Sequence, residues 1–358
     1  MNLTAAVVVC AYTERRWDDL CAAVDSALAQ DPRPREVVLV VDHHEGLLER
    51  AHRELTAAVT VLANTRRRGL SGARNTAVDH VRASGGADVV AFLDDDAAAR
   101  PGWLAALLAP YADPAVAAVG GTAVPRWPGG DAPAVLPPEL WWVVGCTYTG
   151  QHPERGAVEV RNLMGCSMSF RLTALDAAGE FAEEMGRIGT VPLGCEETEL
   201  CLRVRQYVPG ARVLLEPAAV VDHRVSADRT GWSYLGRRAL AEGLSKAAVT
   251  RRAGTGRGLA AEADYTRRVL PVALGREARS AVAALAAGDP AAAQDRVRAG
   301  GAIVLAVGAA GVGFLRGRAA ETAPPEHRIR SGAGRPWRSR AGRAGPPSWR
   351  RRHSPPRS

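Results

Sequence analysis

Short apolar runs alternate with segments of helical periodicity along the N-terminal part of the chain. The apolar runs, which suit strands covered on both faces of a parallel sheet, occupy residues 5–11, 36–42, 59–64 and 89–94. The segments with apolar residues at helical spacing occupy residues 16–30, 46–57 and 71–84. Because strands and helices alternate with short connections, the pattern predicts an α/β fold with a doubly wound, mostly parallel sheet and flanking helices.

The alternation becomes less regular after about residue 112. A stretch rich in Pro and Trp at residues 125–145 predicts a long connection or a mobile flap. The later elements that the pattern predicts are strands at residues 116–124 and 160–171, two short strands within 211–225 on either side of Pro217, and helices at residues 194–207 and 232–252. The last of these helices is amphipathic and basic.

Three adjacent carboxylates, Asp94, Asp95 and Asp96, end the strand predicted at residues 89–94. Ligands of open α/β sheets bind at the carboxyl ends of strands, and the first two strands also end in polar residues. Adjacent buried carboxylates repel one another unless a positive charge offsets them, and hard divalent cations prefer such oxygen ligands. The alternative is a cap for the helix that follows, but a cap needs one acid rather than three. The stretch therefore predicts a metal and nucleotide site.

The charge of the chain is uneven. The full sequence of 358 residues carries a net charge of +8, but residues 318–358 hold 11 Arg and 2 Glu and leave the other residues close to neutral. A near-neutral body argues against a nucleic-acid-binding core. The six cysteines form no C-x-x-C pair, and the N-terminal apolar run follows no basic residue. We therefore expect free thiols and a cytoplasmic protein whose first apolar run is a strand rather than a signal peptide.

Several motifs occur in a fixed order along the chain. They are "CAYTE" at 10–14, the strand that ends in Asp42, "RRRGLSGARN" at 66–75, "FLDDD" at 92–96, "GCEETELCLR" at 194–203 and "VDHRV" at 221–225. Together they resemble the motifs of the family 2 glycosyltransferases, which have the GT-A fold, over roughly residues 5–225. The resemblance implies transfer of a sugar from a nucleotide-diphosphate donor, with inversion and with Mg²⁺ or Mn²⁺ as the cofactor; a UDP-sugar is the first expectation for the donor.

The resemblance also implies residues that bind the nucleotide. Asp42 matches the acid that contacts the base or ribose of the donor, and a turn acid is its alternative role. Tyr12 and Glu14 match the first loop, which lines the nucleotide pocket, although Glu14 suits a solvated loop acid equally well. Arg74 matches the arginine of the "ARN" motif, where a guanidinium can meet the diphosphate. An ordinary surface arginine is the alternative.

The acid cluster matches the "DXD" signature of the family. By this match Asp94 and Asp95 reach the ribose, while Asp94 and Asp96 hold the metal, which bridges the two phosphates and neutralises charge on the leaving nucleotide. His223, in "VDHRV", matches a late histidine that can complete the metal shell. A polar residue at a strand end is the alternative for His223.

The catalytic base is expected in "CEETE". An inverting transfer needs a carboxylate that takes the proton from the acceptor hydroxyl, and the start of a helix helps to keep a carboxylate ionised. The family usually has Glu-Asp at this point, whereas this chain has Glu196-Glu197, so Glu197 holds the position of the base. Glu196 and Glu199 are the alternatives, as is a purely structural role for acids at a helix start.

The C-terminal part of the chain differs in character. An uncharged run at residues 299–315 has arginines on both sides and is just long enough to span a membrane, to lie at its surface or to pack as an ordinary helix. The domains expected are a GT-A-like domain at 1–228, a helical region at 229–298, the candidate membrane segment at 299–315 and a disordered basic tail at 316–358. Attachment to the cytoplasmic face of a membrane would favour a glycan or lipid-linked acceptor, in envelope polysaccharide or glycolipid synthesis.

Two other classes of protein compete with this interpretation. A nucleotidyltransferase shares the sheet and the acidic metal site, but it usually has a Gly-rich basic loop after the first strand, where this chain has "CAYTERRW". A catalytically silent, membrane-tethered protein that binds nucleotide sugars is the second alternative. The number of retained carboxylates argues against it.

Overall fold

The computed structural model describes residues 3–151, 156–186, 194–253 and 260–322. It divides the chain into two units, Met1–Ala319 and Ala320–Ser358, and the fold given below is that of the first unit. The tail predicted to be disordered lies outside the described residues from residue 323 onward. Its first residues, 316–322, are helical, in keeping with the high helix propensity of Arg and Ala.

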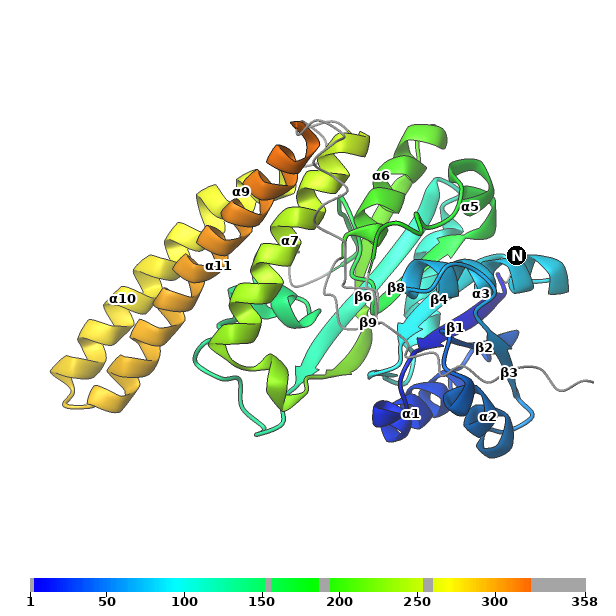
Figure 1. Ribbon diagram of the computed structural model, residues 1–358, viewed down its shortest axis with the longest axis horizontal. Helices are drawn as coiled ribbons and strands as arrows, with labels where there is room; N and C mark the ends of the chain where they lie inside the picture. Colours follow the sequence, from blue (N-terminus) through cyan, green and yellow to red (C-terminus); the bar gives the residue numbers. More distant parts are fainter. Residues whose placement is uncertain (1–2, 152–155, 187–193, 254–259, 323–358) are drawn as a thin grey trace, which may run out of the picture. The chain divides into compact units, whose positions relative to one another are not determined.

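Among the described residues, nine strands form one sheet in the order β3-β2-β1-β4-β8-β6-β9-β5, and β7 pairs with β9 beside this path. Figure 1 shows the part of the sheet from β3 to β9. The strands are β1 Ala5–Ala11, β2 Glu36–Val41, β3 Val59–Ala63, β4 Val89–Asp94, β5 Ala97–Ala99, β6 Val116–Arg126, β7 Val158–Glu159, β8 Ser167–Arg171 and β9 Arg212–Arg224. The strands β3, β2, β1 and β4, which are neighbours in that order, pair in parallel. In contrast, β8 runs antiparallel to both β4 and β6. The predicted α/β class is confirmed; the pairing is parallel among the N-terminal strands and again between β6 and β9, with the antiparallel β8 between these two parts.

Helices cover both faces of the parallel strands. The helices of this part of the fold are α1 Trp17–Leu28, α2 Glu45–Glu54, α3 Leu70–Ser84, α4 Trp103–Leu108, α5 Leu172–Ala178 and α6 Glu196–Tyr207. Successive side chains of β1 point to opposite faces, so Val7 enters the core that contains α1 and α2, and Val8 enters the core that contains α3 and α6. The doubly wound arrangement follows from this alternation.

The structure corrects the two short strands expected on either side of Pro217. A single strand, β9, runs from Arg212 to Arg224 through this proline. Its pairing with β6 shifts register between Gly120, which pairs with Leu215, and Thr122, which pairs with Val220. Proline is tolerated within a strand at such an irregularity because no ladder hydrogen bond needs its missing N–H.

Two loop regions shape the edge of the sheet where the strands end. The strand expected at residues 160–171 is confined to β8, and residues 161–166 form a loop ahead of it. The Pro- and Trp-rich connection contains a 3₁₀ helix, η3, at Pro138–Val144. The other 3₁₀ helices are η1 Glu14–Arg16, η2 Ala109–Ala112 and η4 Ala227–Arg229. The loop before β8, η3 and η1 all contribute residues to the pocket described below.

Helices follow the last strand of the sheet, β9, along the chain. They are α7 Trp232–Ala253, α9 Ala260–Asp264, a π-helix η5 Tyr265–Val269, α10 Leu270–Ala286 and α11 Pro290–Thr322, and α10 and α11 run side by side in Figure 1. A Cβ atom at Gly243 of α7 would lie 2.0 Å from the carbonyl oxygen of Ala310, and one at Gly313 of α11 would lie 2.0 Å from that of Leu240. Only glycine permits this approach, so α11 packs closely against α7.

Candidate active site

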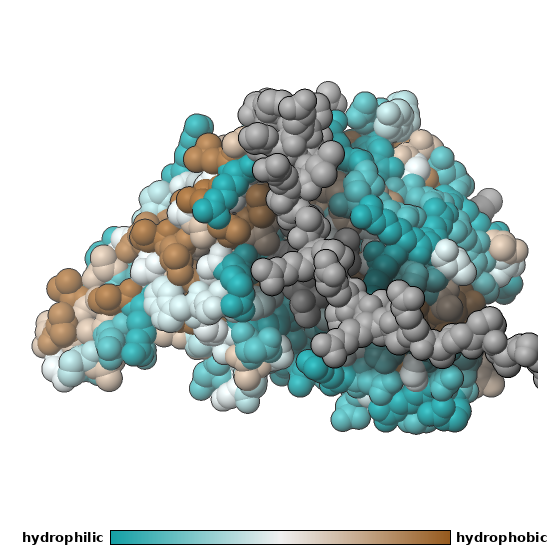
Figure 2. Space-filling model, viewed as in Figure 1, coloured by the Kyte–Doolittle hydropathy of each residue, from teal (hydrophilic) through white to brown (hydrophobic). Residues whose placement is uncertain are grey.

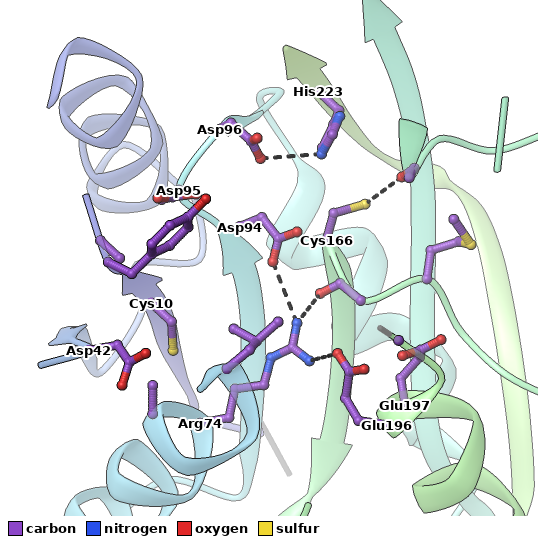
Figure 3. A pocket seen from close by; sticks show the side chains of 18 of the residues that line it. Cys10, Asp42, Arg74, Asp94, Asp95, Asp96, Cys166, Glu196, Glu197 and His223 are labelled. Carbon is purple, nitrogen blue, oxygen red and sulfur yellow. Dashed lines mark hydrogen bonds and ion pairs between the residues drawn. The ribbon is translucent and has the colours of Figure 1, made fainter. Parts of the chain in front are cut away.

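A pocket opens at the carboxyl ends of β1, β2 and β4, where the sequence predicts a ligand. The described residues that line it are Cys10, Ala11, Tyr12, Arg16, Asp42, Leu70, Ala73, Arg74, Asp94, Asp95, Asp96, Trp142, Val143, Gly145, Met164, Gly165, Cys166, Gly194, Cys195, Glu196, Glu197, His223, Arg229 and Arg238. Segments far apart in the sequence therefore meet here, and Figure 3 shows the acidic and basic side chains facing one another across the pocket.

Two of the three adjacent acids lie beside a histidine from a distant strand. β5 follows the acids directly and pairs with β9 so that Ala97 stands opposite His223. This pairing leaves the Nε2 atom of His223 3.2 Å from the Oδ1 atom of Asp96. One ligand atom each from Asp94, Asp96 and His223 lies within 4.8 Å of the others. Two carboxylates and an imidazole suit a divalent cation such as Mg²⁺ or Mn²⁺, so these residues fit the predicted metal.

Arginines also contact the acids. Arg16 Nη1 lies 2.7 Å from Asp95 Oδ1 and 2.7 Å from Asp96 Oδ2, and Arg229 Nη1 lies 3.5 Å from Asp96 Oδ2. Burial alone would raise the pKa of Asp96, but the charges of His223, Arg16 and Arg229 hold it well below its usual range. Burial alone would lower the pKa of His223, but the Asp96 carboxylate raises it to about 10. Asp96 and His223 thus form a charged pair near neutral pH, and His223 would lose its proton on binding a cation.

Arg74 links the acids at the end of β4 to those at the start of α6. Its side chain is only 2% exposed, and its Nη1 atom donates a hydrogen bond of 2.9 Å to Glu196 Oε1. The Nη2 atom donates to the carbonyl oxygen of Gly165 at 3.0 Å and lies 3.5 Å from Asp94 Oδ1. Figure 3 shows this guanidinium between Asp94 and Glu196. The structure therefore excludes the alternative that Arg74 is an ordinary surface arginine.

The acids at the start of α6 differ in their partners. Glu196 is buried and held by Arg74, while Glu199 lies 2.6 Å from Arg203 and does not line the pocket. Glu197 lines the pocket and is half-buried. Burial and the neighbouring charge of Glu196 raise the pKa of Glu197 to about 8, so the expectation that the helix start keeps this carboxylate ionised near neutral pH is wrong. A carboxylate that titrates near neutral pH is matched to accepting a proton from a hydroxyl.

The comparisons with known proteins agree with this geometry. Residues 6–177 match the family model for glycosyl transferase family 2. A glucosyl-dolichyl phosphate glucuronosyltransferase of Haloferax volcanii is 34% identical over 249 residues, which cover 68% of this chain and 76% of that protein. The chain is a family 2 glycosyltransferase. Its membership decides against the nucleotidyltransferase alternative and confirms the class of enzyme predicted from the motifs.

Two further proteins resemble this glycosyltransferase. Polypeptide N-acetylgalactosaminyltransferase 15 of Mus musculus is 39% identical over 116 residues, which cover 31% of this chain and 17% of that protein. A mannosyltransferase of Pyrobaculum calidifontis, solved in complex with GDP-Man and Mn²⁺, is 23% identical with a TM-score of 0.58 and covers 88% of both chains. The structural similarity to the mannosyltransferase shows that this chain has the GT-A fold.

Of the residues predicted to bind the nucleotide, some line the pocket of this glycosyltransferase and one does not. Asp42 and Tyr12 line the pocket. Asp42 is buried, and it accepts hydrogen bonds from Asn64 Nδ2 at 2.7 Å and from the backbone N–H of Gly69 at 3.0 Å. Glu14 does not line the pocket, and its side chain is 44% exposed. The position of Glu14 therefore agrees with a solvated loop acid, and its predicted role in nucleotide binding gains no support from the geometry.

Several residues of the pocket are not among those predicted from the sequence. Arg16, Arg229 and Arg238 supply its positive charge together with Arg74, and Trp142 contributes an aromatic wall from η3. Arg16 follows the "YTE" strand end by only two residues, and this proximity is the one local signal that could have identified it. Arg229 and Arg238 also line the pocket, although both lie beyond residue 228, where the predicted catalytic domain ends.

Proposed function

We propose that this glycosyltransferase moves a sugar, with inversion, from a nucleotide-diphosphate donor to a hydroxyl of a lipid-linked acceptor at the cytoplasmic face of a membrane. The observation that carries the proposal is the arrangement of two sets of acids in one pocket. Asp94, Asp96 and His223 offer a metal and diphosphate site at the strand ends, and Glu197 faces the same pocket from the start of α6.

The donor is proposed to bind at the carboxyl ends of β1, β2 and β4. Asp42 and Tyr12 would contact the nucleoside, and Asp94, Asp96 and His223 would hold Mg²⁺ or Mn²⁺. When bound, such a cation would neutralise charge on the leaving diphosphate. The mannosyltransferase of similar fold was solved with GDP-Man and Mn²⁺, which supports a nucleotide sugar and a divalent metal; a UDP-sugar remains our first candidate.

The acceptor is proposed to react beside Glu197. In an inverting transfer the acceptor oxygen attacks the anomeric carbon as the bond to the diphosphate breaks, and the carboxylate takes the hydroxyl proton. Arg74 would orient the neighbouring Glu196 and the donor-side Asp94 through the contacts given above. The raised pKa of Glu197 supports it as the base, because a carboxylate of higher pKa is a stronger proton acceptor once it is ionised.

An exposed apolar surface supports a lipid-linked acceptor. Among the described residues, one helical segment, Pro290–Ala319, is long and apolar enough to cross a membrane. Yet Ala302, Ile303 and Ala306 of α11 are buried in the core, while other large apolar side chains of α10 and α11 are exposed: Val272, Val282, Leu285, Val297, Val304, Leu305, Val307, Val312 and Leu315. Figure 2 shows apolar residues over these helices. We propose that α11 lies along the membrane surface while its other face stays packed in the protein.

The Haloferax volcanii relative supports the same class of acceptor, because its name describes transfer to glucosyl-dolichyl phosphate. The proposal can be tested with purified full-length protein, Mn²⁺ or Mg²⁺, a panel of UDP- and GDP-sugars, and polyprenyl phosphate glucose in mixed micelles. We expect one donor to support transfer to the lipid, with loss of activity when the metal is chelated. Absence of both transfer and donor hydrolysis across the panel would refute the proposed donor class.

A further inference from the structure

His223, one of the three candidate metal residues, has a neighbour at each of its two ring nitrogens. Its Nε2 atom lies 3.2 Å from Asp96 Oδ1, on the side of the candidate metal site (Figure 3). Its Nδ1 atom lies 3.6 Å from the Sγ atom of Cys146 and forms a hydrogen bond with it. The side chain of His223 is 3% exposed, and Cys146 is fully buried. The imidazole is therefore held between a carboxylate and a thiol, with little access for water.

The backbone around Cys146 fixes the position of its thiol. Gly145, which ends η3, has a φ of +80°, in the left-handed region that favours glycine. The N–H of Cys146 donates a hydrogen bond to the carbonyl oxygen of Trp141 at 3.1 Å. Thr147 is tied to Ala123 of β6 by two hydrogen bonds, of 3.0 Å and 2.9 Å. Because β6 also pairs with β9, which carries the histidine, the same part of the sheet positions the thiol and the imidazole.

The turn at Gly145 also packs against the imidazole ring. A Cβ atom at Gly145 would lie 3.7 Å from both Cε1 and Nε2 of His223, which is van der Waals contact. The Sγ atom of Cys166 donates a hydrogen bond to the carbonyl oxygen of Gly145 at 3.3 Å and so holds this turn from the other side. In the described part of the chain, Cys146 is the only hydrogen-bond partner of Nδ1. The orientation of the ring therefore depends on the thiol.

The partner of Nδ1 matters for metal binding because a ring nitrogen that carries a proton cannot coordinate a cation. A neutral imidazole has one proton, so coordination through Nε2 requires this proton on Nδ1. Metal-binding histidines almost always donate that second N–H to an acceptor, which fixes the ring and its tautomer. In this chain a thiol sulfur lies where such an acceptor is expected. If the thiol instead donated to Nδ1, the proton would lie on Nε2 and would prevent coordination.

We propose that Cys146 is a positioning residue for the metal site. Its sulfur accepts the hydrogen bond from Nδ1–H of His223 and directs Nε2 toward the cation that Asp94 and Asp96 would also bind. This inference rests on the proposed function, because it takes His223 as a metal ligand. Cys146 acts through the histidine and is not itself a ligand, since its sulfur faces the opposite ring nitrogen.

The first test measures the Mn²⁺ affinity of the full-length protein from the electron paramagnetic resonance signal of free Mn²⁺. Loss of the outer partner of a metal ligand typically weakens binding by about 10- to 100-fold, and we expect about tenfold for Cys146→Ala because sulfur is a weak acceptor. Cys146→Ser keeps an acceptor and should restore most of the affinity. Cys201→Ala is the matched control, because Cys201 is also fully buried but packs in the core on the other face of the sheet. It should bind Mn²⁺ as the wild type does.

Nitrogen-15 NMR of the histidine rings gives a second readout, which general destabilisation would not change. With Mg²⁺ bound, the signals of His223, assigned by their loss in His223→Ala, should show a proton on Nδ1 and none on Nε2. The Nδ1–H signal should shift in Cys146→Ala and should stay unchanged in Cys201→Ala. A proton on Nε2 and a bare Nδ1 in the Mg²⁺-bound wild type would overturn the proposal. If Cys146→Ala does not fold, these signals of the wild type decide.

His223→Ala separates this proposal from the proposed function. If this variant binds Mn²⁺ as tightly as the wild type, the assignment of His223 to the metal fails, and the role of Cys146 fails with it. If His223→Ala weakens binding and Cys146→Ala does not, only the role of Cys146 fails. An equal loss of affinity in Cys146→Ala and Cys201→Ala would show a general effect of core cavities and would also overturn the role of Cys146.

Discussion

The change Glu197→Gln tests the most specific chemical role assigned to this chain. It keeps the size and polarity of the side chain and removes its ability to accept a proton. General-base assistance is typically worth about 10²- to 10⁴-fold in rate, so turnover should fall by that factor. Affinity for the donor should change little, because the proposed donor contacts come from β1, β2 and β4 rather than from α6.

The raised pKa of Glu197 adds a quantitative pH dependence. With a pKa of about 8, roughly a tenth of the molecules carry the ionised base at pH 7 and about nine tenths carry it at pH 9. Since only the ionised form accepts a proton, turnover of the wild type should rise about tenfold over this interval. Glu196→Gln should move the rise to lower pH, because it removes the like charge that helps to raise the pKa of Glu197.

The assay measures initial rates at saturating donor and acceptor between pH 6 and pH 9, with donor affinity measured separately by calorimetry. Glu199→Gln is the matched control on the same helix: Glu199 pairs with Arg203 away from the pocket, so the pH profile should stay that of the wild type. Turnover of Glu197→Gln within about threefold of wild type, or a flat wild-type profile above pH 7, would refute the assignment of the base. Loss of donor binding in Glu197→Gln would make it a donor-pocket residue instead.

Three further predictions concern the metal, the buried ion pair and the helix packing. Asp96→Asn should weaken Mn²⁺ binding at least about tenfold by calorimetry, and unchanged affinity would exclude Asp96 as a ligand. Arg74→Ala removes the partner of buried Glu196 and should lower the free energy of unfolding by about 3–5 kcal/mol in chemical denaturation; a change below about 1 kcal/mol would contradict a stabilising role for the pair. Gly313→Val would press a side chain against the backbone of α7 and should lower the melting temperature by several degrees. Gly308→Val serves as the control, because a Cβ atom at Gly308 meets open space. Equal effects of the two changes would contradict close packing of α11 on α7.

The strands and helices of the N-terminal half could be predicted because their signal is local. The apolar runs of β1, β2 and β4 are buried on both faces, so the run itself indicates the strand. β9 was predicted with a break at Pro217 because the rule against proline in strands is also local. The register shift that tolerates this proline arises from the pairing with β6, and the sequence of β9 contains no sign of it.

Part of the candidate site could be predicted for the same reason. Asp42 and the acids from Asp94 to Asp96 follow buried strands directly, and the carboxyl ends of adjacent parallel strands meet at one edge of the sheet. Motif order added Glu197 and His223. Sequence alone could not choose among the acids of α6, because the choice depends on partners: Arg74 lies 122 positions from Glu196 in the chain, and only folding brings them together.

The sequence by itself determined the order of the elements in the N-terminal half, the acidic strand ends and the family, since each of these depends on residues that are close together in the chain. The tertiary structure decided which charges meet. Arg16 reaches Asp95 and Asp96 across about 80 residues, and Arg238 reaches the pocket from a helix outside the predicted catalytic domain. The tertiary structure also decided how α11 packs. Its apolar run alone was compatible with spanning a membrane, with lying on a membrane surface and with packing as an ordinary helix. Its glycines match the backbone of α7 because two helices approach closely only where both lack side chains, a property of the pair rather than of either segment.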